Sequence, residues 1–399
     1  MADECATASP GACRRESPHR MGYVKTIDPS GGGTSGTFGP RAGAFHIPSL
    51  DGIRAIAVLV VFVGHGYLAP AAWPGHVGVT IFFFLSGYLI TTLLRREYAK
   101  TRTVSLRRFY LRRALRILPP AFLAIIVTVA LGATGIVVSS TTGWGVLAEF
   151  LNYTNYYIVL FGRDGLPPES TQLWSLSVEE HYYLVVPAVL LVLFRRKLSV
   201  RAIGWILVVV ASAVPVWRIY LGLTGASFDR LYVSTDTRID SLIFGSAMAL
   251  LLNPALGDRL PGGARTDWHV RRWIAPLAVV VFVAVALVPQ LEFRLSIADT
   301  IQCLCLVPIF WYIIVHPHST VGRILNHPVV QKIGALSFSI YLFHRLVLVL
   351  VDQSFITVPA VVDLVSLILT ILLAQVVFVS VERPCGRLRK RLEYSLPLR

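Results

Sequence analysis

Long apolar runs alternate with short polar segments through most of the 399-residue chain. A helix needs about 20 apolar residues to cross roughly 30 Å of hydrocarbon. Ten runs reach or approach that length, near residues 53–69, 77–94, 118–138, 174–194, 202–222, 238–253, 272–289, 297–315, 334–352 and 359–381. Two of them, 53–69 and 238–253, are short for a span. The pattern predicts an all-α, polytopic membrane protein with about ten transmembrane helices.

The distribution of basic residues predicts an orientation. The chain is 55% hydrophobic and only 15% charged, whereas about a quarter of the residues in soluble domains are charged. The net charge of +15 could indicate nucleic-acid binding, but nine basic residues lie between positions 95 and 116, and the loops of the opposite side hold only Arg163, Arg230 and Arg294. By the positive-inside rule, both termini are predicted in the cytosol and the protein in the inner (cytoplasmic) cell membrane. No nucleic-acid partner is expected.

Composition divides the chain into three parts. Residues 1–45 are rich in Gly, Ser, Pro and Arg, which is typical of disorder, so a disordered cytosolic tail is predicted there. Residues 46–385 form the predicted transmembrane domain, and residues 386–399 a basic cytosolic tail. The five cysteines show neither a pairing framework nor metal-ligand spacing. No metal site and no tightly bound cofactor is predicted.

The first span, within LDGIRAIAVLVVFVGHGYLAP, carries two ionisable side chains. Arg54 and His65 are eleven positions apart, which places them within about 20° of one helix face and roughly 16 Å apart along the axis. An ionisable group in a span is costly and marks a candidate functional site. Alternatively, Arg54 reaches lipid phosphates and His65 is a satisfied core histidine. Gly64 and Gly66 leave room beside His65 for another chain segment or a substrate.

The fourth span opens with TQLWSLSVEEHYYLVVP. Ser177 and Glu180 fit a capping box, but this leaves Glu179 unexplained. A carboxylate at the depth of His65 could hold the imidazole tautomer and stabilise its cation while it acts as a base. We therefore predict that either Glu179 or Glu180 assists His65, and the sequence leaves the choice open.

Further polar side chains interrupt or border other spans. Arg238 and Asp240, at the start of the sixth span, could form a local ion pair or contact a substrate. His344 and Arg345 lie too deep in the ninth span to reach water easily, so both are expected to face a polar cavity. The candidate substrate-binding or structural polar residues are Trp174, Arg238, Asp240, Tyr341, His344 and Arg345.

A cationic cluster lies at the predicted cytosolic face. Arg112, Arg113 and Arg116 precede the third span, and Arg54 lies near the same mouth. Such a cluster commonly contacts anionic lipid, but arginines also bind phosphates bidentately. These four residues are therefore predicted to bind a phosphorylated cosubstrate.

A phosphate site inside, a polar stripe and a histidine near the outside suit acyl transfer from acyl-CoA, with acetyl-CoA the expected donor. The base removes a hydroxyl proton from the acceptor, which attacks the thioester directly. No serine or cysteine nucleophile stands in a recognisable elbow, so a covalent acyl-enzyme is not favoured.

Six segments, in order, resemble the acyltransferase 3 family of multipass bacterial membrane O-acyltransferases: SLDGIRAIAVLVVFVGH, GVTIFFFLSGYLIT, RRALRILPP, LWSLSVEEHYYLVVP, RIDSLIFG and SFSIYLFH. The resemblance implies a ten-helix fold that acylates hydroxyls of glycans, lipids or antibiotic sugars. It also implies that His65 is essential and that Arg113 and Arg116 serve the acyl donor. His181 stands where many relatives have glutamine, which leaves the role of that position open.

The expected acceptor is a hydroxyl of a cell-envelope glycan or glycolipid. One alternative is a small molecule such as a macrolide antibiotic sugar. A proton-coupled transporter is an alternative of another class, but transporters show internal repeats and broken helices, and neither is visible in the sequence. A non-catalytic scaffold would leave His65, Glu180, His344 and Arg345 without a reason.

Overall fold

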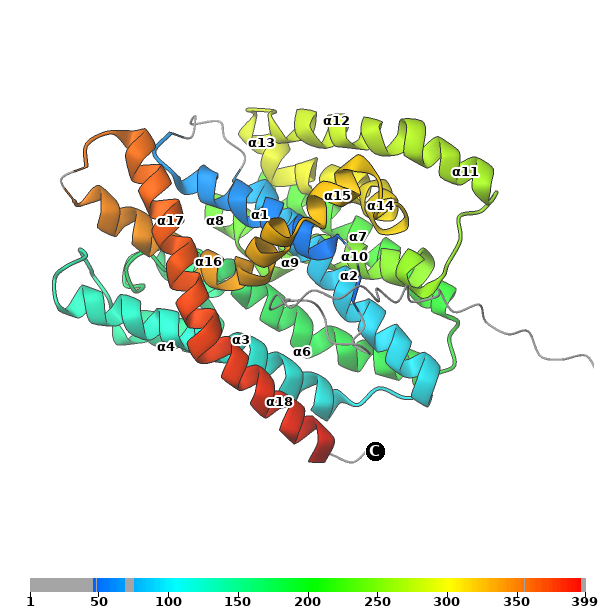
Figure 1. The fold of residues 1–399 in the computed structure, drawn as a ribbon, viewed down its shortest axis with the longest axis horizontal. Coiled ribbons are helices and arrows are strands. Elements are labelled where there is room, and N and C mark those ends of the chain that lie inside the picture. The colour runs from blue at the N-terminus through cyan, green and yellow to red at the C-terminus, as the bar shows by residue number, and fades with distance from the viewer. Residues whose placement is uncertain (1–45, 48, 69–74, 355, 396–399) are drawn as a thin grey trace, which may run out of the picture. The chain divides into compact units, whose positions relative to one another are not determined.

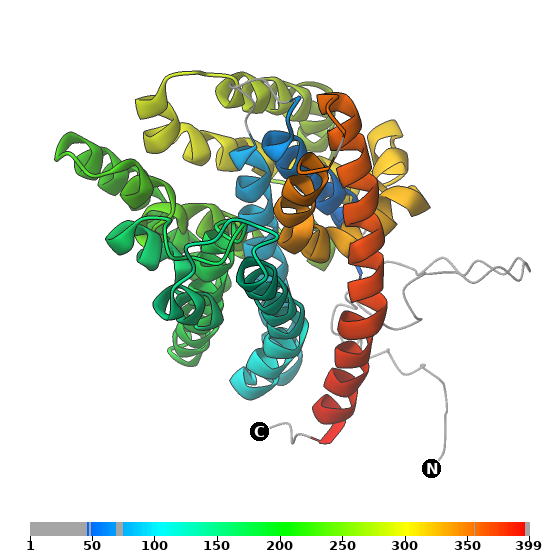
Figure 2. The ribbon, with the colours of Figure 1, turned by 90° about the vertical axis from the view of Figure 1, so that its left-hand side faces the viewer.

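The computed structural model describes residues 46–395, apart from 48, 69–74 and 355, and side chains as far as residue 392. The predicted disordered tail, residues 1–45, lies outside the described residues. Helices make up the regular structure of the described part, in which no strand occurs. The body Ile47–Arg399 is one compact unit, shown in two views in Figures 1 and 2. The all-α prediction is confirmed.

Eight helices of the described part are long and apolar enough to cross a membrane. Three of them are joined from shorter elements by π-helical turns. The eight are α2 (His76–Thr101), α3 (Leu106–Ala133), α6 (Leu173–Arg195), α7 (Val200–Leu223), α11 to α12 (Ala264–Ala286), α13 to α14 (Leu291–Val315), α16 (Pro328–Asp352) and α17 with much of α18 (Pro359–Leu392). They coincide with eight of the ten predicted runs.

The other two runs form shorter helices, α1 (Leu50–His65) and α10 (Asp240–Leu251). The 12 residues of α10 extend about 18 Å, well short of the hydrocarbon thickness. Its residues are buried from Asp240 to Leu250, because α10 packs tightly against α2: a Cβ on Gly245 would lie 2.0 Å from the carbonyl oxygen of Phe84. This run is apolar because it is a core helix.

Short helices connect the long ones. They are α4 (Gly143–Phe150), α5 (Thr154–Phe161), α8 (Phe228–Tyr232), α9 (Thr235–Arg238), η1 (Pro254–Leu256) and α15 (Thr320–Leu325). The predicted basic tail is helical as far as Ser395, where it forms α18 (Arg383–Ser395) directly after the π-helical turn Phe378–Glu382. The last long helix therefore continues through most of the segment predicted as a tail.

The contact of α1 with α16 positions the candidate site. A Cβ on Gly334 would lie 1.8 Å from the carbonyl oxygen of Asp51, so the absence of a side chain lets the two helices approach closely. Val58, Leu336 and Ile340 form an apolar cluster between them. Figures 1 and 2 show the two helices side by side. Residues near positions 65 and 344 are thereby brought together.

Candidate active site

A cavity of about 320 Å³ lies where α1 ends, between the ends of several helices. Its wall is polar for a site among apolar helices. The ionisable or hydrogen-bonding side chains on the wall are His65, His76, Arg163, Thr171, Gln172, Trp174, Tyr232, Arg238, Arg294, Asp299, Tyr341 and Arg345. Of the predicted site residues, the cavity thus brings together His65, Trp174, Arg238, Tyr341 and Arg345.

His65 meets His344 at this cavity. Nε2 of His344 lies 3.2 Å from Nδ1 of His65. The Nδ1 atoms also lie beside main-chain oxygens, at 2.9 Å from Val61 for His65 and 2.7 Å from Tyr341 for His344. A carbonyl only accepts hydrogen bonds, so in the neutral rings each Nδ1 carries the hydrogen. Nε2 of His65 then keeps its lone pair, which is the form that a general base requires.

Close packing of the chain holds His65 at the wall. A Cβ on Gly66 would lie 2.8 Å from a carboxylate oxygen of Asp363, and a Cβ on Gly75 would lie 3.0 Å from Cα of Gly64. The Asp363 carboxylate also accepts hydrogen bonds from the two main-chain amides that follow Gly66. The glycines on both sides of His65 therefore admit neighbouring chain segments, as the sequence indicates.

Arg345 lies at the cavity through bonds to the loop before α6. Its Nη2 and Nε donate to Glu169 at 2.8 and 3.0 Å, and its Nη1 donates to Thr171 at 3.1 Å. Glu169 has φ of 53°, a conformation that few residues other than glycine adopt. Arg345 lies on the cavity wall, as predicted. His344, which was predicted to face the cavity too, is not a wall residue and is buried at 1% exposure.

The glutamates predicted to assist His65 lie elsewhere. Glu179 accepts a hydrogen bond of 3.0 Å from Tyr183 and interacts electrostatically with Arg54 and Arg113. One carboxylate oxygen of Glu180 is buried without a hydrogen-bond partner among the described residues. Both side chains lie outside the cavity wall, because they are about 8 Å further along α6 than Trp174. The expected contact with His65 does not form, and His344 takes that place.

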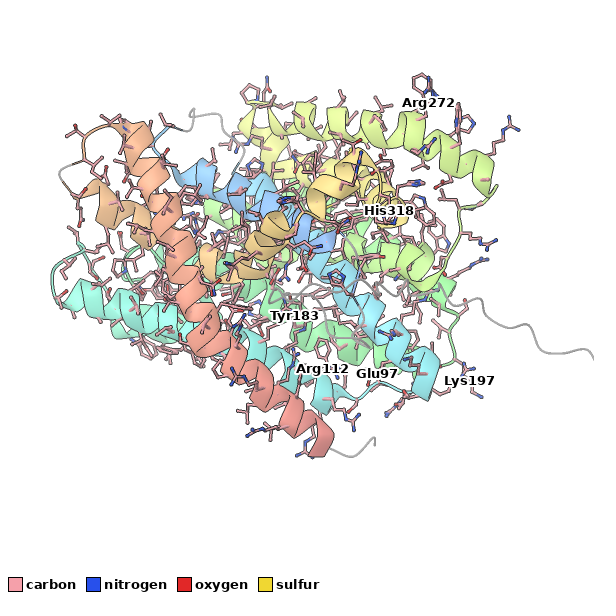
Figure 3. All side chains as sticks on the ribbon, viewed as in Figure 1. Glu97, Arg112, Tyr183, Lys197, Arg272 and His318 are labelled. Carbon is pink, nitrogen blue, oxygen red and sulfur yellow. The ribbon has the colours of Figure 1, made fainter. Side chains whose placement is uncertain are left out.

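Three of the predicted cofactor-binding arginines, Arg54, Arg113 and Arg116, interact electrostatically with one another, and Arg54 and Arg113 also interact with Glu179. Arg113 places its guanidinium 5.3 Å from the ring centroid of Tyr183, and Arg54 lies 3.9 Å from Asp51. Arg112 donates to Glu97 at 3.3 Å, and Figure 3 labels the two close together in the lower part of the view. Arg116 is exposed. The cluster therefore leaves Arg116 accessible, whereas Arg112 is engaged in an ion pair.

Arg238 and Asp240 do not form the local ion pair considered from the sequence. Arg238 bonds to Asp299 of α14, and Asp240 accepts from Arg218 of α7 at 2.7 Å. Arg218 also lies 3.5 Å from Asp299. All four side chains are buried, and the charges balance. The reason is geometric, since residues two positions apart do not face each other on a helix.

The remaining candidates have structural partners. The Tyr341 hydroxyl donates to the main-chain oxygen of Gln172 at 3.0 Å, and Trp174 lies with its ring centroid 5.8 Å from the Arg238 guanidinium. His181 is away from the cavity, with Nδ1 at 2.7 Å from the Thr235 hydroxyl. Sequence reasoning missed Arg218, Asp299 and Glu169; the first two interrupt apolar runs and carry the same signal as His344.

Glu149 of α4 predicts a pH-dependent stability. Its side chain is 2% exposed, and burial raises its pKa to about 8 although a hydrogen bond from Ser170 lowers it. The folded protein therefore keeps a proton that the unfolded chain loses above the ordinary pKa of 4.5. The contribution of Glu149 to the free energy of unfolding is therefore largest below pH 4.5 and falls as the pH rises to about 8. Glu149→Gln stays neutral and is expected to raise the thermal midpoint by several degrees at pH 8, with little effect at pH 5.

Thermal unfolding of the purified protein at both pH values tests this, with the exposed Glu292→Gln as the matched control. A Glu149→Gln midpoint at pH 8 no higher than that of wild type would contradict it.

A bundle of apolar helices around a polar cavity with a histidine pair at its wall defines a multipass membrane protein with a polar site among its helices. The family comparison names its class. A family model described as an acyltransferase domain matches residues 47–379, so the chain belongs to the acyltransferase 3 family. The resemblance seen in the sequence is confirmed. No solved structure matches the chain.

Curated relatives carry related names. Peptidoglycan O-acetyltransferase OatA of Listeria monocytogenes is 30% identical over 307 residues, which cover 75% of this chain and 49% of that protein. The putative peptidoglycan O-acetyltransferase YrhL of Bacillus subtilis is 32% identical over 330 residues, or 76% and 49% of the two chains. A putative O-acetyltransferase of Staphylococcus aureus is 27% identical over 360 residues, or 85% and 57%. The chain spans about half the length of the curated relatives it matches.

Proposed function

We propose that the protein transfers an acyl group, with acetyl as the expected group, from acyl-CoA to a hydroxyl of a cell-envelope glycan. The observation that carries the proposal is the His65 imidazole, whose Nε2 keeps its lone pair at a polar cavity. A cavity of about 320 Å³ is at the small end of ligand sites and suits one sugar unit. The acyltransferase family and the names of the relatives support the same chemistry.

His65 acts as the base in the proposed reaction. Its Nε2 removes the proton of the acceptor hydroxyl, and the oxygen forms an ester bond with the acyl carbon while the carbon–sulfur bond breaks. The protonated imidazole returns that proton to the departing thiolate. His344 accepts the His65 Nδ1 hydrogen and so holds the ring.

The distance between His65 and the arginine group of Arg54, Arg113 and Arg116 favours an extended donor. Arg54 is roughly 16 Å along the helix axis from His65. A donor with phosphates at one end and a thioester at the end of a long arm can span this distance, whereas a compact acyl phosphate cannot. Arg116 is exposed to receive phosphates at the proposed cytosolic end, and Arg113 interacts electrostatically with Glu179.

The test is acyl transfer by purified protein in lipid nanodiscs. Acetyl-CoA is supplied with a panel of oligosaccharides, and free thiol and acetylated product are both followed. Acceptor-dependent thiol release with a matching ester product is expected, and His65→Ala protein is the inactive control. If folded wild-type protein releases no thiol with any acyl-CoA and any acceptor of the panel, acyl transfer is the wrong function and the transporter alternative gains weight.

A further inference from the structure

The cavity wall carries four arginines: Arg163, Arg238, Arg294 and Arg345. Three of them have a carboxylate partner. Arg163 pairs with Asp229 at 2.5 Å, Arg345 with Glu169 at 2.8 Å, and Arg238 with Asp299. Each of these three positive charges is therefore neutralised by a carboxylate: Asp229 and Glu169 lie outside the wall, and Asp299 belongs to it.

Arg294 differs from the other three. Its Nη2 lies 3.1 Å from Nδ1 of His76, another residue of the wall. A guanidinium only donates hydrogen bonds, so Nδ1 of His76 must accept and the imidazole is neutral. Among the residues that the structure describes, no carboxylate forms an ion pair with Arg294. The neighbouring Glu292 is exposed and two positions away, where helical side chains do not face each other.

The backbone around Arg294 is also unusual. Arg294 begins a π-helical turn, Arg294–Ala298, between α13 (Leu291–Phe293) and α14 (Asp299–Val315). Such turns are rare and frequently occur at functional sites. The segment 69–74, which precedes His76 in sequence, reads APAAWP and brings no acidic residue. The cavity thus has one positive charge that neither its described partners nor this adjoining segment neutralises.

We propose that Arg294, bonded to His76, binds a carboxylate of the acceptor, so that the preferred acceptors are acidic sugars or glycans. The proposal rests on the proposed function, because it assigns the cavity to the acceptor. A carboxylate carries the single negative charge that matches one unpaired guanidinium, and the fork of Arg294 can bind its two oxygens. Arg294 is therefore a specificity residue for the acceptor.

The experiment compares binding of two matched probes, methyl β-glucoside and methyl β-glucuronide, which differ only at C6. Binding to wild-type protein in nanodiscs is measured by saturation-transfer NMR titration. The glucuronide is expected to bind about tenfold or more tightly, since a charged hydrogen bond is worth about 1.5–3 kcal/mol. Arg294→Gln should abolish this preference, and Arg294→Lys should restore part of it.

Arg323→Gln is the matched control, because Arg323 is exposed and lies outside the cavity wall; it should keep the preference. Equal binding of the two probes by wild type, or a preference that survives in Arg294→Gln, would overturn the proposal. Tighter binding of methyl glucoside 6-phosphate than of the glucuronide would also overturn it, because the site would then be a phosphate site. The titration needs no turnover. Acyl transfer with equal probe binding refutes the Arg294 proposal alone, whereas probe preference without any acyl transfer refutes the proposed function alone.

Discussion

Replacing His65 by alanine is expected to lower acyl transfer by about 10²–10⁴-fold, the usual contribution of a general base. The reason is that His65 lies on the cavity wall and its Nε2 keeps the lone pair that a base requires. The rate of acceptor-dependent thiol release from acetyl-CoA measures the effect. His181→Ala is the matched control, since His181 bonds to Thr235 away from the cavity.

Comparing the transfer rates of the single and double alanine variants distinguishes the role of His344 from that of His65. If His344 acts by holding the His65 ring, His344→Ala lowers the rate less than His65→Ala does. The double variant is then no slower than His65→Ala alone, because effects of residues that act as a unit are not additive. Folded His65→Ala protein that keeps more than about a tenth of wild-type activity would show that His65 is not the base.

Replacing Asp299 by alanine is expected to destabilise the protein by about 3–5 kcal/mol, the usual cost of breaking a buried ion pair. Asp299 is 1% exposed. It accepts hydrogen bonds from Thr80 at 2.7 Å, from Arg218 at 3.5 Å and from Arg238. Without it, Arg218 keeps only Asp240, and Arg238 loses its carboxylate partner. The loss should appear in the free energy of unfolding measured with denaturant in mixed micelles.

The control is Asp229→Ala, which breaks an ion pair with Arg163 at the surface. The two side chains of that pair are 28% and 40% exposed, so the expected loss is below about 1 kcal/mol. Asp299→Asn keeps an acceptor for Thr80 and should fall between the two. An Asp299→Ala protein as stable as Asp229→Ala would mean that the buried charges are compensated in another way.

The helices themselves follow from local sequence, because apolar length is a local property. The runs at 53–69 and 238–253, which are short for a span, correspond to the short helices α1 and α10. The same reasoning identified His65, His344 and Arg345 as costly polar side chains within spans, and the structure brings His65 and Arg345 to one cavity. Arg218 and Asp299 could have been found by the same criterion, because they also interrupt apolar runs.

Only the tertiary structure decided which of these side chains pair. His65 and His344 are 279 positions apart, and Arg238 and Asp299 are 61 apart. The first meeting depends on how closely α1 approaches α16, which the glycine contact at Gly334 permits, and the second joins α9 to α14. A hydrophobic pattern fixes the face that each helix buries, but the partner of a buried charge depends on helix register and depth. The sequence therefore determined the helices and the candidate histidine, whereas helix packing decided that His344, and not Glu179 or Glu180, holds it.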